Sequence, residues 1–234
     1  MASKYPLTRS IVNESIARAK KCFQRFGVAL PPFALWTAAD WAGKGPEADE
    51  LRDCMLGWDV TDFGSERFYE IGRVLFTLRN GTTRQAGYAK SYAEKLLFDP
   101  ELQRAPAHYH RSKNEDICCR AGGNILVQLT GLNPDDTVSD RPLTIKVDGW
   151  ATAVAAKGIV RLRPGMSVNI PPRTIHQFWG EEGTGETVSS EVSSVCDDLA
   201  DNVFLQAAVR FPPLVEDAPK QHLLCHEYPA AARD

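Results

Sequence analysis

The sequence predicts a mainly β protein, an antiparallel sandwich or barrel preceded by a helical segment. Two observations support this fold class. Short segments rich in Val, Ile, Leu, Phe and Thr recur between residues 66 and 228, and turn-forming residues separate them at short intervals. The first 65 residues lack this pattern and instead contain a stretch with helical periodicity. We therefore expect one structural domain, with an N-terminal helical and loop extension over residues 1–65 packed on a barrel formed by residues 66–234.

The helical stretch lies between Thr8 and Gly27. Its apolar residues recur at steps of three or four positions, at Val12, Ile16, Ala19, Phe23 and Phe26. Thr8 or Ser10 suits the start of this helix and Gly27 suits its end. Residues 38–56 mix Gly, Pro and Trp with acidic residues, which predicts a short helix within loops that wrap a core built elsewhere.

Ten segments have the composition of strands. They are Arg73–Arg79, Lys90–Phe98, Ala107–His110, Asn124–Thr130, Leu143–Val147, Thr152–Ala155, Ile159–Leu162, Ser167–Ile170, Ile175–Trp179 and Val188–Val195. The dipeptide Asn80-Gly81 signals a hairpin, and Lys157-Gly158 predicts another tight one. Residues 212–234 are acidic and contain proline, which predicts a surface tail.

Composition excludes several classes of protein. The chain of 234 residues is 43% hydrophobic and 24% charged, so wholesale disorder is excluded. Its 27 basic and 30 acidic residues leave a net charge of −3, which provides no basic surplus to hold a nucleic acid. No apolar run approaches the roughly 18–20 residues that a membrane helix needs. We therefore expect neither nucleic acid nor membrane as a partner.

The six cysteines include no CxxC pair, and their spacing is irregular. The N-terminus, MASKYPLTRS, lacks the apolar segment of a secretion signal. A disulfide framework is not expected in a chain of this size without such a signal. These observations predict reduced thiols and a cytoplasmic protein.

Histidines and one carboxylate suggest a metal site. His108 and His110 are two positions apart, so on a strand both imidazoles would point to the same face. Glu115 could return to the same ion if the chain turns onto a neighbouring strand. His176, on a distant strand, could complete the site if the sheet closes into a barrel. Three imidazoles and one carboxylate suit Mn²⁺, Fe²⁺, Ni²⁺ or Zn²⁺, and a six-coordinate ion would keep two positions for substrate oxygens.

The spacing of these residues resembles the two motifs of the cupin family. The first is His-x-His, three or four residues, Glu, six residues and Gly, matched by His108, His110, Glu115 and Gly122. The second is matched by Gly165, Pro171 and His176. The chain departs from the family pattern where glycine or asparagine is usual, at Leu102, Arg173 and Gly180. The resemblance implies a cupin barrel, which is a double-stranded β-helix or jelly roll.

A closer resemblance covers about residues 10–228. The strings AHYHRSKNEDICCRAGGN, IPPRTIHQFWG, SSEVSSVCDDLADNVF and RFPPLVED resemble the D-lyxose isomerase family of cupins. This implies an aldose–ketose isomerase that interconverts D-lyxose with D-xylulose, and often D-mannose with D-fructose. It also implies a cytoplasmic homodimer, a monosaccharide substrate and one divalent ion, most typically Mn²⁺, with Co²⁺, Ni²⁺, Fe²⁺ or Zn²⁺ as alternatives. By motif position, the ligands are His108, His110, Glu115 and His176.

Isomerisation needs a base that moves a proton between C2 and C1 of the sugar. Two residues suit this chemistry. Lys113 shares strand parity with the ligands around it, and Glu191 interrupts a strand of small and β-branched residues. We assign to Glu191 the transfer of the proton between C2 and C1. We assign to Lys113 the transfer of the proton between the two sugar oxygens. The alternatives are that Lys113 is a solvated loop residue and that Glu191 faces outward from its strand. A metal-assisted hydride shift between C2 and C1 is a competing mechanism.

Further residues are candidates for binding the sugar. Arg210 could hydrogen-bond to hydroxyl groups, and Trp179 and its neighbour Phe178 could pack against the apolar face of the ring. The alternatives are a surface salt bridge for Arg210 and a position in the barrel core for the aromatic side chains. Two rival functions also stay open: an Fe²⁺ dioxygenase on the same barrel, and a sugar- or metal-binding cupin without activity. Neither a GxGxxG run nor a phosphate-binding loop occurs, which disfavours nucleotide chemistry.

Overall fold

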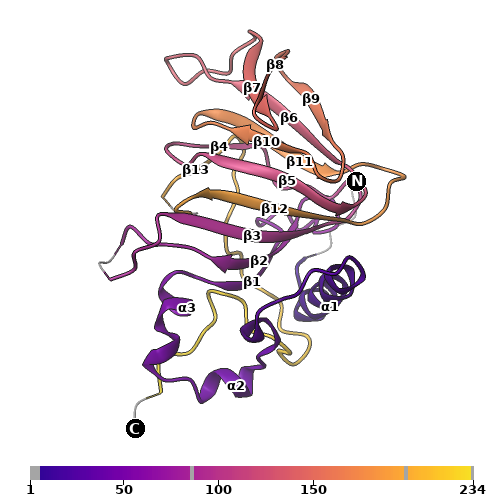
Figure 1. The fold of residues 1–234 in the computed structure, drawn as a ribbon. Coiled ribbons are helices and arrows are strands. Elements are labelled where there is room, and N and C mark those ends of the chain that lie inside the picture. Colours follow the sequence, from indigo (N-terminus) through magenta and orange to yellow (C-terminus); the bar gives the residue numbers. More distant parts are fainter. Residues whose placement is uncertain (1–5, 85–86, 198–199, 233–234) are drawn as a thin grey trace.

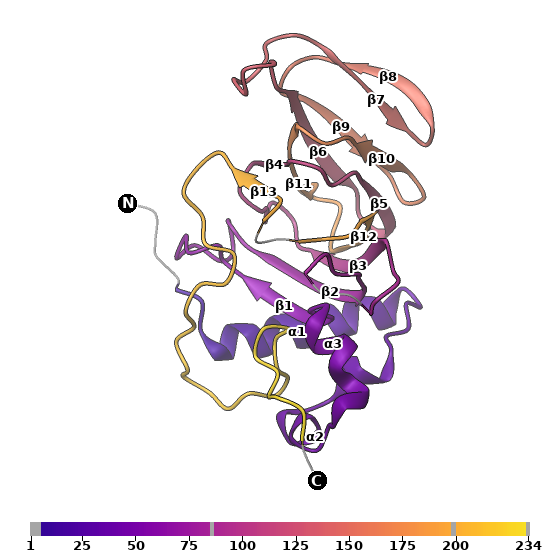
Figure 2. The ribbon, with the colours of Figure 1, turned by 90° about the vertical axis from the view of Figure 1, so that its left-hand side faces the viewer.

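Two antiparallel sheets face each other and form the body of the protein (Figure 1). The computed structural model describes residues 6–84, 87–197 and 200–232. Helix α1, Arg9–Arg25, lies against strands β1 to β3 on the outer side of the larger sheet, in both ribbon views (Figures 1 and 2). The C-terminal segment runs beside the N-terminal helices at the same end of the molecule.

The larger sheet has eight strands and the smaller sheet has five. The larger contains, in spatial order, β1 Gly57–Thr61, β2 Arg73–Arg79, β3 Tyr92–Asp99, β12 Thr187–Ser194, β5 Glu115–Gly122, β10 Ser167–Ile170, β7 Leu143–Val147 and β8 Trp150–Val154. The smaller contains β13 Asn202–Phe204, β4 His108–His110, β11 Thr174–Gly180, β6 Ile125–Gly131 and β9 Gly158–Leu162. A mainly β fold of two antiparallel sheets with an N-terminal helix is thereby confirmed.

The first helix of the N-terminal region begins and ends where the sequence predicts. The Thr8 side chain accepts a hydrogen bond from the backbone N–H of Ile11 and caps α1, and Gly27 ends it with a φ of 72°. Four short elements follow: η1 Pro32–Leu35, α2 Ala38–Ala42, η2 Pro46–Ala48 and α3 Asp49–Asp53. Trp41 and Ala48 do not merely wrap a distant core, because they form a small apolar cluster of their own with Leu223.

All ten expected strands are present within a few residues of their predicted limits. Three further strands, β1, β5 and β13, were not expected. Strand β1 is buried at every position and therefore shows no alternation, and β5 begins with two acidic residues, Glu115 and Asp116. Because β1 pairs with β2, the larger sheet begins inside the segment 1–65 that we expected as a helical extension.

The first predicted hairpin is present with a longer connection than expected, and the second is wrong. Strands β2 and β3 do pair, but the connection between them runs from Asn80 to residue 91, and Asn80 uses its side chain to bind both backbone groups of Cys196. The dipeptide Lys157-Gly158 does not join paired strands, because β8 pairs with β7 and β9 pairs with β6. This turn therefore carries the chain from one sheet to the other.

Alternate residues of the same strands enter two separate cores. On β2 and β3, Phe76 and Phe98 face the helix side and pack with residues of α1 such as Phe23. Their neighbours Leu75 and Leu97 face the smaller sheet and pack in the cluster that contains its Ile125, Val127 and Leu129. The inner core fills one end of the space between the sheets, and the polar residues described below occupy the other.

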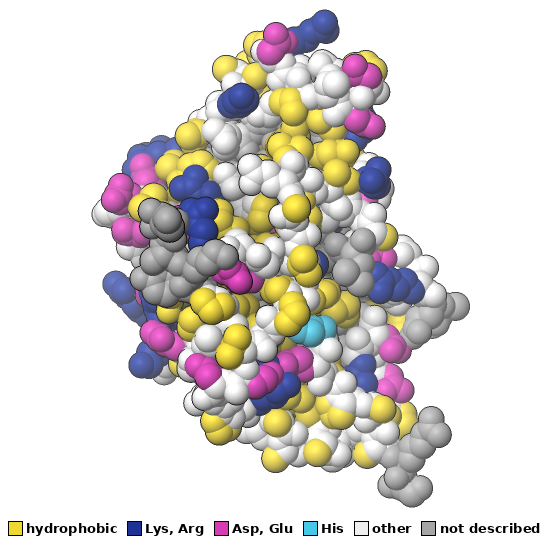
Figure 3. All heavy atoms as spheres, turned by 180° about the vertical axis from the view of Figure 1, so that it is seen from behind, with side chains coloured by type: hydrophobic (Ala, Val, Ile, Leu, Met, Phe, Trp, Pro, Cys, Tyr) yellow, Lys and Arg dark blue, Asp and Glu magenta, His cyan; other side chains and the backbone are white. Residues whose placement is uncertain are grey.

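The C-terminal segment is not the surface tail that its composition predicts. Leu224 is fully buried and forms a parallel bridge with Trp58 on β1. Arg9 on α1 is also fully buried and binds two carboxylates of this segment, Glu216 and Glu227. The rear face of the molecule mixes acidic, basic and apolar side chains, and histidine atoms reach the surface there (Figure 3). No helix among the described residues is long and apolar enough to span a membrane.

Candidate active site

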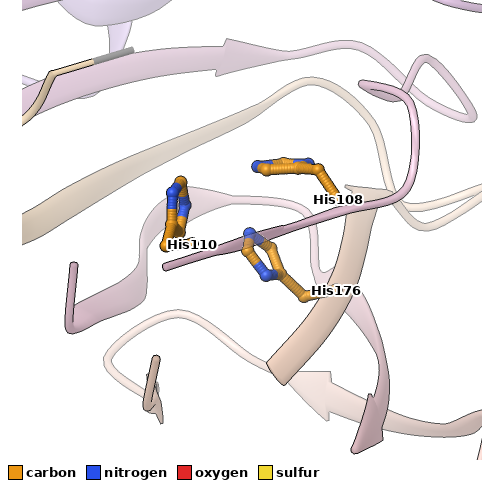
Figure 4. Close-up of side chains that lie close together, drawn as sticks. All are labelled: His108, His110 and His176. Atoms are coloured by element: carbon orange, nitrogen blue, oxygen red, sulfur yellow. The ribbon is translucent and has the colours of Figure 1, made fainter. Parts of the chain in front are cut away.

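Three histidines converge between the sheets (Figure 4). His108 and His110 extend from the same face of β4, and His176 comes from β11, which pairs with β4. The ring centroids of His108 and His176 lie 4.3 Å apart, and those of His110 and His176 lie 5.3 Å apart. One ring nitrogen from each of the three lies within 4.8 Å of the others. This geometry allows all three imidazoles to contact one ion.

Glu115, the first residue of β5, reaches the same place from the larger sheet. Its side chain is 2% exposed. One carboxylate oxygen, Oε1, lies 2.9 Å from Nε2 of His176, and the other, Oε2, lies 3.4 Å from Nε2 of His110. Burial alone would raise the pKa of Glu115, but Lys113 and the histidines outweigh burial and hold that pKa well below its usual range. The group is therefore a carboxylate in the folded protein.

His108, His110 and Glu115 have the protonation states that binding of a divalent cation requires. Burial lowers the pKa values of His108 and His110, so both imidazoles are neutral near pH 7. In His108 and His176, Nδ1 bonds to the backbone oxygens of Pro106 and Thr174, at 2.9 and 3.0 Å, which leaves Nε2 of each as the donor atom. Among the described residues, neither buried ring nitrogen of His110 has a hydrogen-bond partner. Three imidazoles and a carboxylate fit a divalent cation, and His108, His110 and His176 form a candidate metal site.

Lys113 and Glu191 form a buried ion pair next to the histidines. Nζ of Lys113 lies 2.8 Å from Oε1 of Glu191 and 2.7 Å from Oε2 of Glu115. Both side chains point inward, because Lys113 is 3% and Glu191 is 9% exposed. Burial alone would raise the pKa of Glu191, but Lys113 and Lys95 lower it below its ordinary value. The solvated and outward-facing alternatives for these two residues therefore do not describe the structure.

Of the candidates for sugar binding, the structure brings Arg210 and Phe178 to the site and leaves Trp179 outside it. Arg210 lines the cavity that contains the histidines and forms an ion pair with Asp59. Trp179 neighbours Phe178 on β11, so its side chain lies on the opposite face of the strand from His176. Its ring packs under the guanidinium of Arg104, 4.3 Å away. The adjacent Phe178 lines the cavity in its place.

The sequence did not reveal three polar residues of the site. Lys95 on β3 lies opposite Glu191 in the sheet, with Nζ 3.2 Å from Oε1 of Glu191. Arg73 lines the same cavity and binds the buried Asp99. Asp201 accepts hydrogen bonds from the backbone of Ser112 and Lys113 and lies 3.4 Å from Nδ1 of His110. Signals were available for two of them: a lysine stands inside the apolar strand AEKLLF, and Asp201 lies within the string SSEVSSVCDDLADNVF that resembles the family.

The cavity around these groups encloses about 490 Å³, including its opening to solvent. Its lining includes the apolar residues Phe63, Leu75, Leu97, Phe178 and Phe204. It also includes the histidines, the two glutamates and the cationic side chains. A site of this kind suits a small, hydroxyl-rich molecule that also presents an apolar face.

Solved structures with a similar fold include L-ribose isomerases. The enzyme from Cellulomonas parahominis, solved with L-ribose, superposes with a TM-score of 0.57 at 16% identity, over 92% of this chain and 99% of that one. The enzyme from Acinetobacter sp. DL28, also with L-ribose, gives a TM-score of 0.58 at 14% identity, over 88% and 96%. At such identities the likeness shows the fold alone, and it confirms the predicted cupin-like barrel.

Sequence comparison gives the family. A D-lyxose/D-mannose isomerase from Serratia proteamaculans is 44% identical over 220 residues, which are 94% of this chain and 96% of that protein. A protein of the same name from Escherichia coli O157:H7 is 41% identical over 223 residues, which are 95% and 98% of the two chains. The model of the D-lyxose isomerase family matches residues 7–228. The predicted resemblance is thereby confirmed, and the chain belongs to the D-lyxose isomerase family.

Proposed function

We propose that this protein is a metal-dependent aldose–ketose isomerase that interconverts D-lyxose with D-xylulose and D-mannose with D-fructose. The observation that carries the proposal is the meeting of three imidazoles with the buried Lys113–Glu191 pair in one cavity. The printed names of the relatives at 44% and 41% identity support the choice of these sugars.

We propose His108, His110, His176 and Glu115 as the residues that hold the ion, and Mn²⁺ as the ion. When bound, such a cation would polarise the sugar carbonyl and stabilise the negative charge that develops on the sugar oxygens. The chain supplies a preformed set of donors, because the imidazoles of His108 and His110 are neutral and Glu115 is ionised. The resemblance to the family supports Mn²⁺ over the other ions that this donor set accepts.

Glu191 is proposed as the base that takes the proton from C2 of the aldose and returns it to C1. Its pKa is lower than usual, so the residue is a carboxylate at neutral pH and can accept this proton. Lys113 donates to Glu191 at 2.8 Å and is proposed to supply and recover the proton on the sugar oxygen. The two groups together move one proton between carbons and one between oxygens, through an enediol, without net consumption of acid or base.

The remaining groups of the cavity are proposed to position the sugar. Arg210 and Arg73 can donate hydrogen bonds to hydroxyl groups, and both line the cavity. Phe178 offers an apolar surface to the C–H face of the ring, a role that the sequence suggested for Phe178 and Trp179 together. A homodimer and a cytoplasmic location complete the proposal. The family resemblance supports the dimer, and the absence of any disulfide among the six cysteines, all of which the structure describes, supports a reducing compartment.

Isomerisation of D-lyxose in heavy water tests both the activity and the assigned base. Proton transfer through Glu191 predicts ketose that carries deuterium from the solvent at C1, together with exchange at C2 of the aldose. Ketose that forms without any deuterium would overturn the assignment of Glu191 and favour a hydride shift. A folded, Mn²⁺-loaded protein that converts neither D-lyxose nor D-mannose would overturn the isomerase proposal itself.

A further inference from the structure

A second group of metal-ligating side chains lies outside the candidate active site. Asp59 on β1 and the adjacent residues Cys225 and His226 each offer one ligand atom, and these atoms lie within 4.8 Å of one another. They provide one oxygen, one sulfur and one nitrogen. Asp59 is far from the other two in the sequence, so the cluster exists only because the C-terminal segment folds against β1.

The backbone holds this cluster in place. The N–H of Cys225 donates to the backbone oxygen of Trp58 at 2.7 Å, and Leu224 forms a parallel bridge with the same residue. The ring of His226 packs against the ring of Phe211, with centroids 4.6 Å apart. Asp59 and Cys225 are buried, whereas His226 is exposed. Two ligands are thus fixed in the protein, and the third can close over an ion from the surface.

Asp59 supplies the observation that points to a ligand. The residue is 1% exposed, and its Oδ2 pairs with the guanidinium of Arg210. The other oxygen, Oδ1, is buried and, within the described part of the chain, has no hydrogen-bond partner. A buried carboxylate oxygen without a donor costs free energy that a cation would recover. The two oxygens can divide between the two partners, with Oδ2 on Arg210 and Oδ1 on the ion.

We propose that Asp59, Cys225 and His226 form a second metal site, which binds a borderline divalent cation of the Zn²⁺ class. Thiolate and imidazole ligands select such an ion, and a water molecule would complete a tetrahedral arrangement. Binding displaces the thiol proton of Cys225 to solvent, so the ion replaces one proton. The site fastens the C-terminal segment to β1. Through the Asp59–Arg210 pair it also fixes a side chain that lines the candidate active site.

Cobalt distinguishes this site from the histidine site, because the latter contains no sulfur. The chelator-treated full-length protein is titrated with Co²⁺ while the absorbance of the sulfur-to-cobalt charge-transfer band is followed and bound metal is counted by equilibrium dialysis. The proposal predicts this band in the native chain and in His176→Ala, in which the histidine site is impaired. It predicts no band in Cys225→Ser. The matched control, Cys54→Ser, removes another buried thiol, which lines a second surface cavity together with Asp59 and Cys225, and it retains the band.

His226→Gln keeps the test decisive if Cys225→Ser fails to fold, because His226 is exposed and its replacement leaves the buried structure intact. We expect its affinity for Co²⁺ at the sulfur site to fall at least about tenfold. A native protein that binds Co²⁺ without any sulfur band would overturn the proposal. A band that survives in Cys225→Ser, or one whose affinity does not change in His226→Gln, would overturn it as well. None of these results depends on isomerase activity.

Discussion

His176 on β11 is the register partner of His108 on β4, and this pairing joins the two halves of the candidate metal site. The pair brings the two ring centroids to 4.3 Å, and the two-residue period of β4 then places His110 on the same face. A slip of one residue in this pairing would turn His176 to the other face of the sheet. The long pairing of β11 with β6 fixes the register against such a slip.

Replacement of Glu191 by Gln tests the proposed base. The variant keeps the shape of the side chain but cannot accept a proton, so we expect kcat on D-lyxose to fall on the order of 10²–10⁴-fold. KM should change little, because the cavity wall is otherwise intact. Steady-state kinetics measures both constants. Glu186→Gln, at a partly exposed carboxylate that pairs with Arg18, is the control and should retain native kinetics. A kcat within a few-fold of the native value would rule out Glu191 as the base.

Lys95→Met tests whether the second lysine keeps Glu191 ionised. Lys95 is one of two cations that lower the pKa of Glu191, so its removal should raise that pKa. Activity that needs the carboxylate appears as pH rises through this pKa. The acid limb of the kcat profile should therefore move to higher pH in the variant. Lys95→Arg retains a cation and should leave the limb closer to its native position. An unchanged limb in Lys95→Met would contradict this role.

Gly122→Ala tests why the first motif ends in glycine. Gly122 has a φ of 91°, and a Cβ there would lie 2.2 Å from the backbone oxygen of Glu186. Strain and collision together should lower the free energy of unfolding by about 2 kcal/mol or more. Gly183→Ala is the matched control, since its φ is 77° but nothing lies within 4 Å of the added carbon. We expect about 1 kcal/mol there. Urea unfolding measures both, and equal losses would refute the collision argument.

Arg9→Met tests the link between α1 and the C-terminal segment. The fully buried Arg9 binds Glu216 and Glu227, and its loss leaves Glu227 with a poorer set of partners. We expect the free energy of unfolding at pH 7 to fall by about 3 kcal/mol, the lower end for buried pairs, because Glu216 is half-exposed. Denaturant unfolding of the native chain and the variant at pH 7 gives this difference directly.

The pair of Arg9 and Glu227 also makes the free energy of unfolding depend on pH. Burial alone would raise the pKa of Glu227, but the hydrogen bond from Arg9 lowers it below its usual value. The stabilisation is therefore complete above the unfolded pKa of about 4.3 and is lost as pH falls through the lower folded value. The difference in stability between native protein and Arg9→Met should narrow as pH falls below about 4. A difference that stays constant down to pH 3 would contradict the assignment.

Sequence patterns predicted the strands in which apolar and polar residues alternate or which are rich in β-branched residues. They missed strands whose sequences show neither feature. Strand β1 is buried on both faces and β5 carries Glu115, so neither has the expected pattern. The C-terminal segment appeared polar because its few buried residues, such as Leu224, lie between charged ones. Its place is set by long-range contacts with β1 and α1, and local composition does not encode these.

The ligands were predictable because their spacing is a property of single strands and of a known motif. Departures from that motif proved compatible with it: Leu102 and Arg173, which replace its usual glycines, adopt φ values of 66° and 61°. Both residues therefore take the left-handed conformation that glycine adopts with least strain. Lys95 was not predictable, because only the pairing of β3 with β12 brings it to Glu191. The partners of a site depend on register, which one sequence does not reveal.

The most direct test of the account is isomerase turnover of the chelated protein before and after Mn²⁺ is restored. D-lyxose is the substrate, D-xylulose is the detected product, and His176→Ala is assayed in parallel with a check that it remains folded. The account predicts negligible turnover without metal, recovery when Mn²⁺ is added to the native chain, and no recovery in His176→Ala. Full turnover by the chelated protein, or recovery in folded His176→Ala equal to that of the native chain, would contradict the central claim.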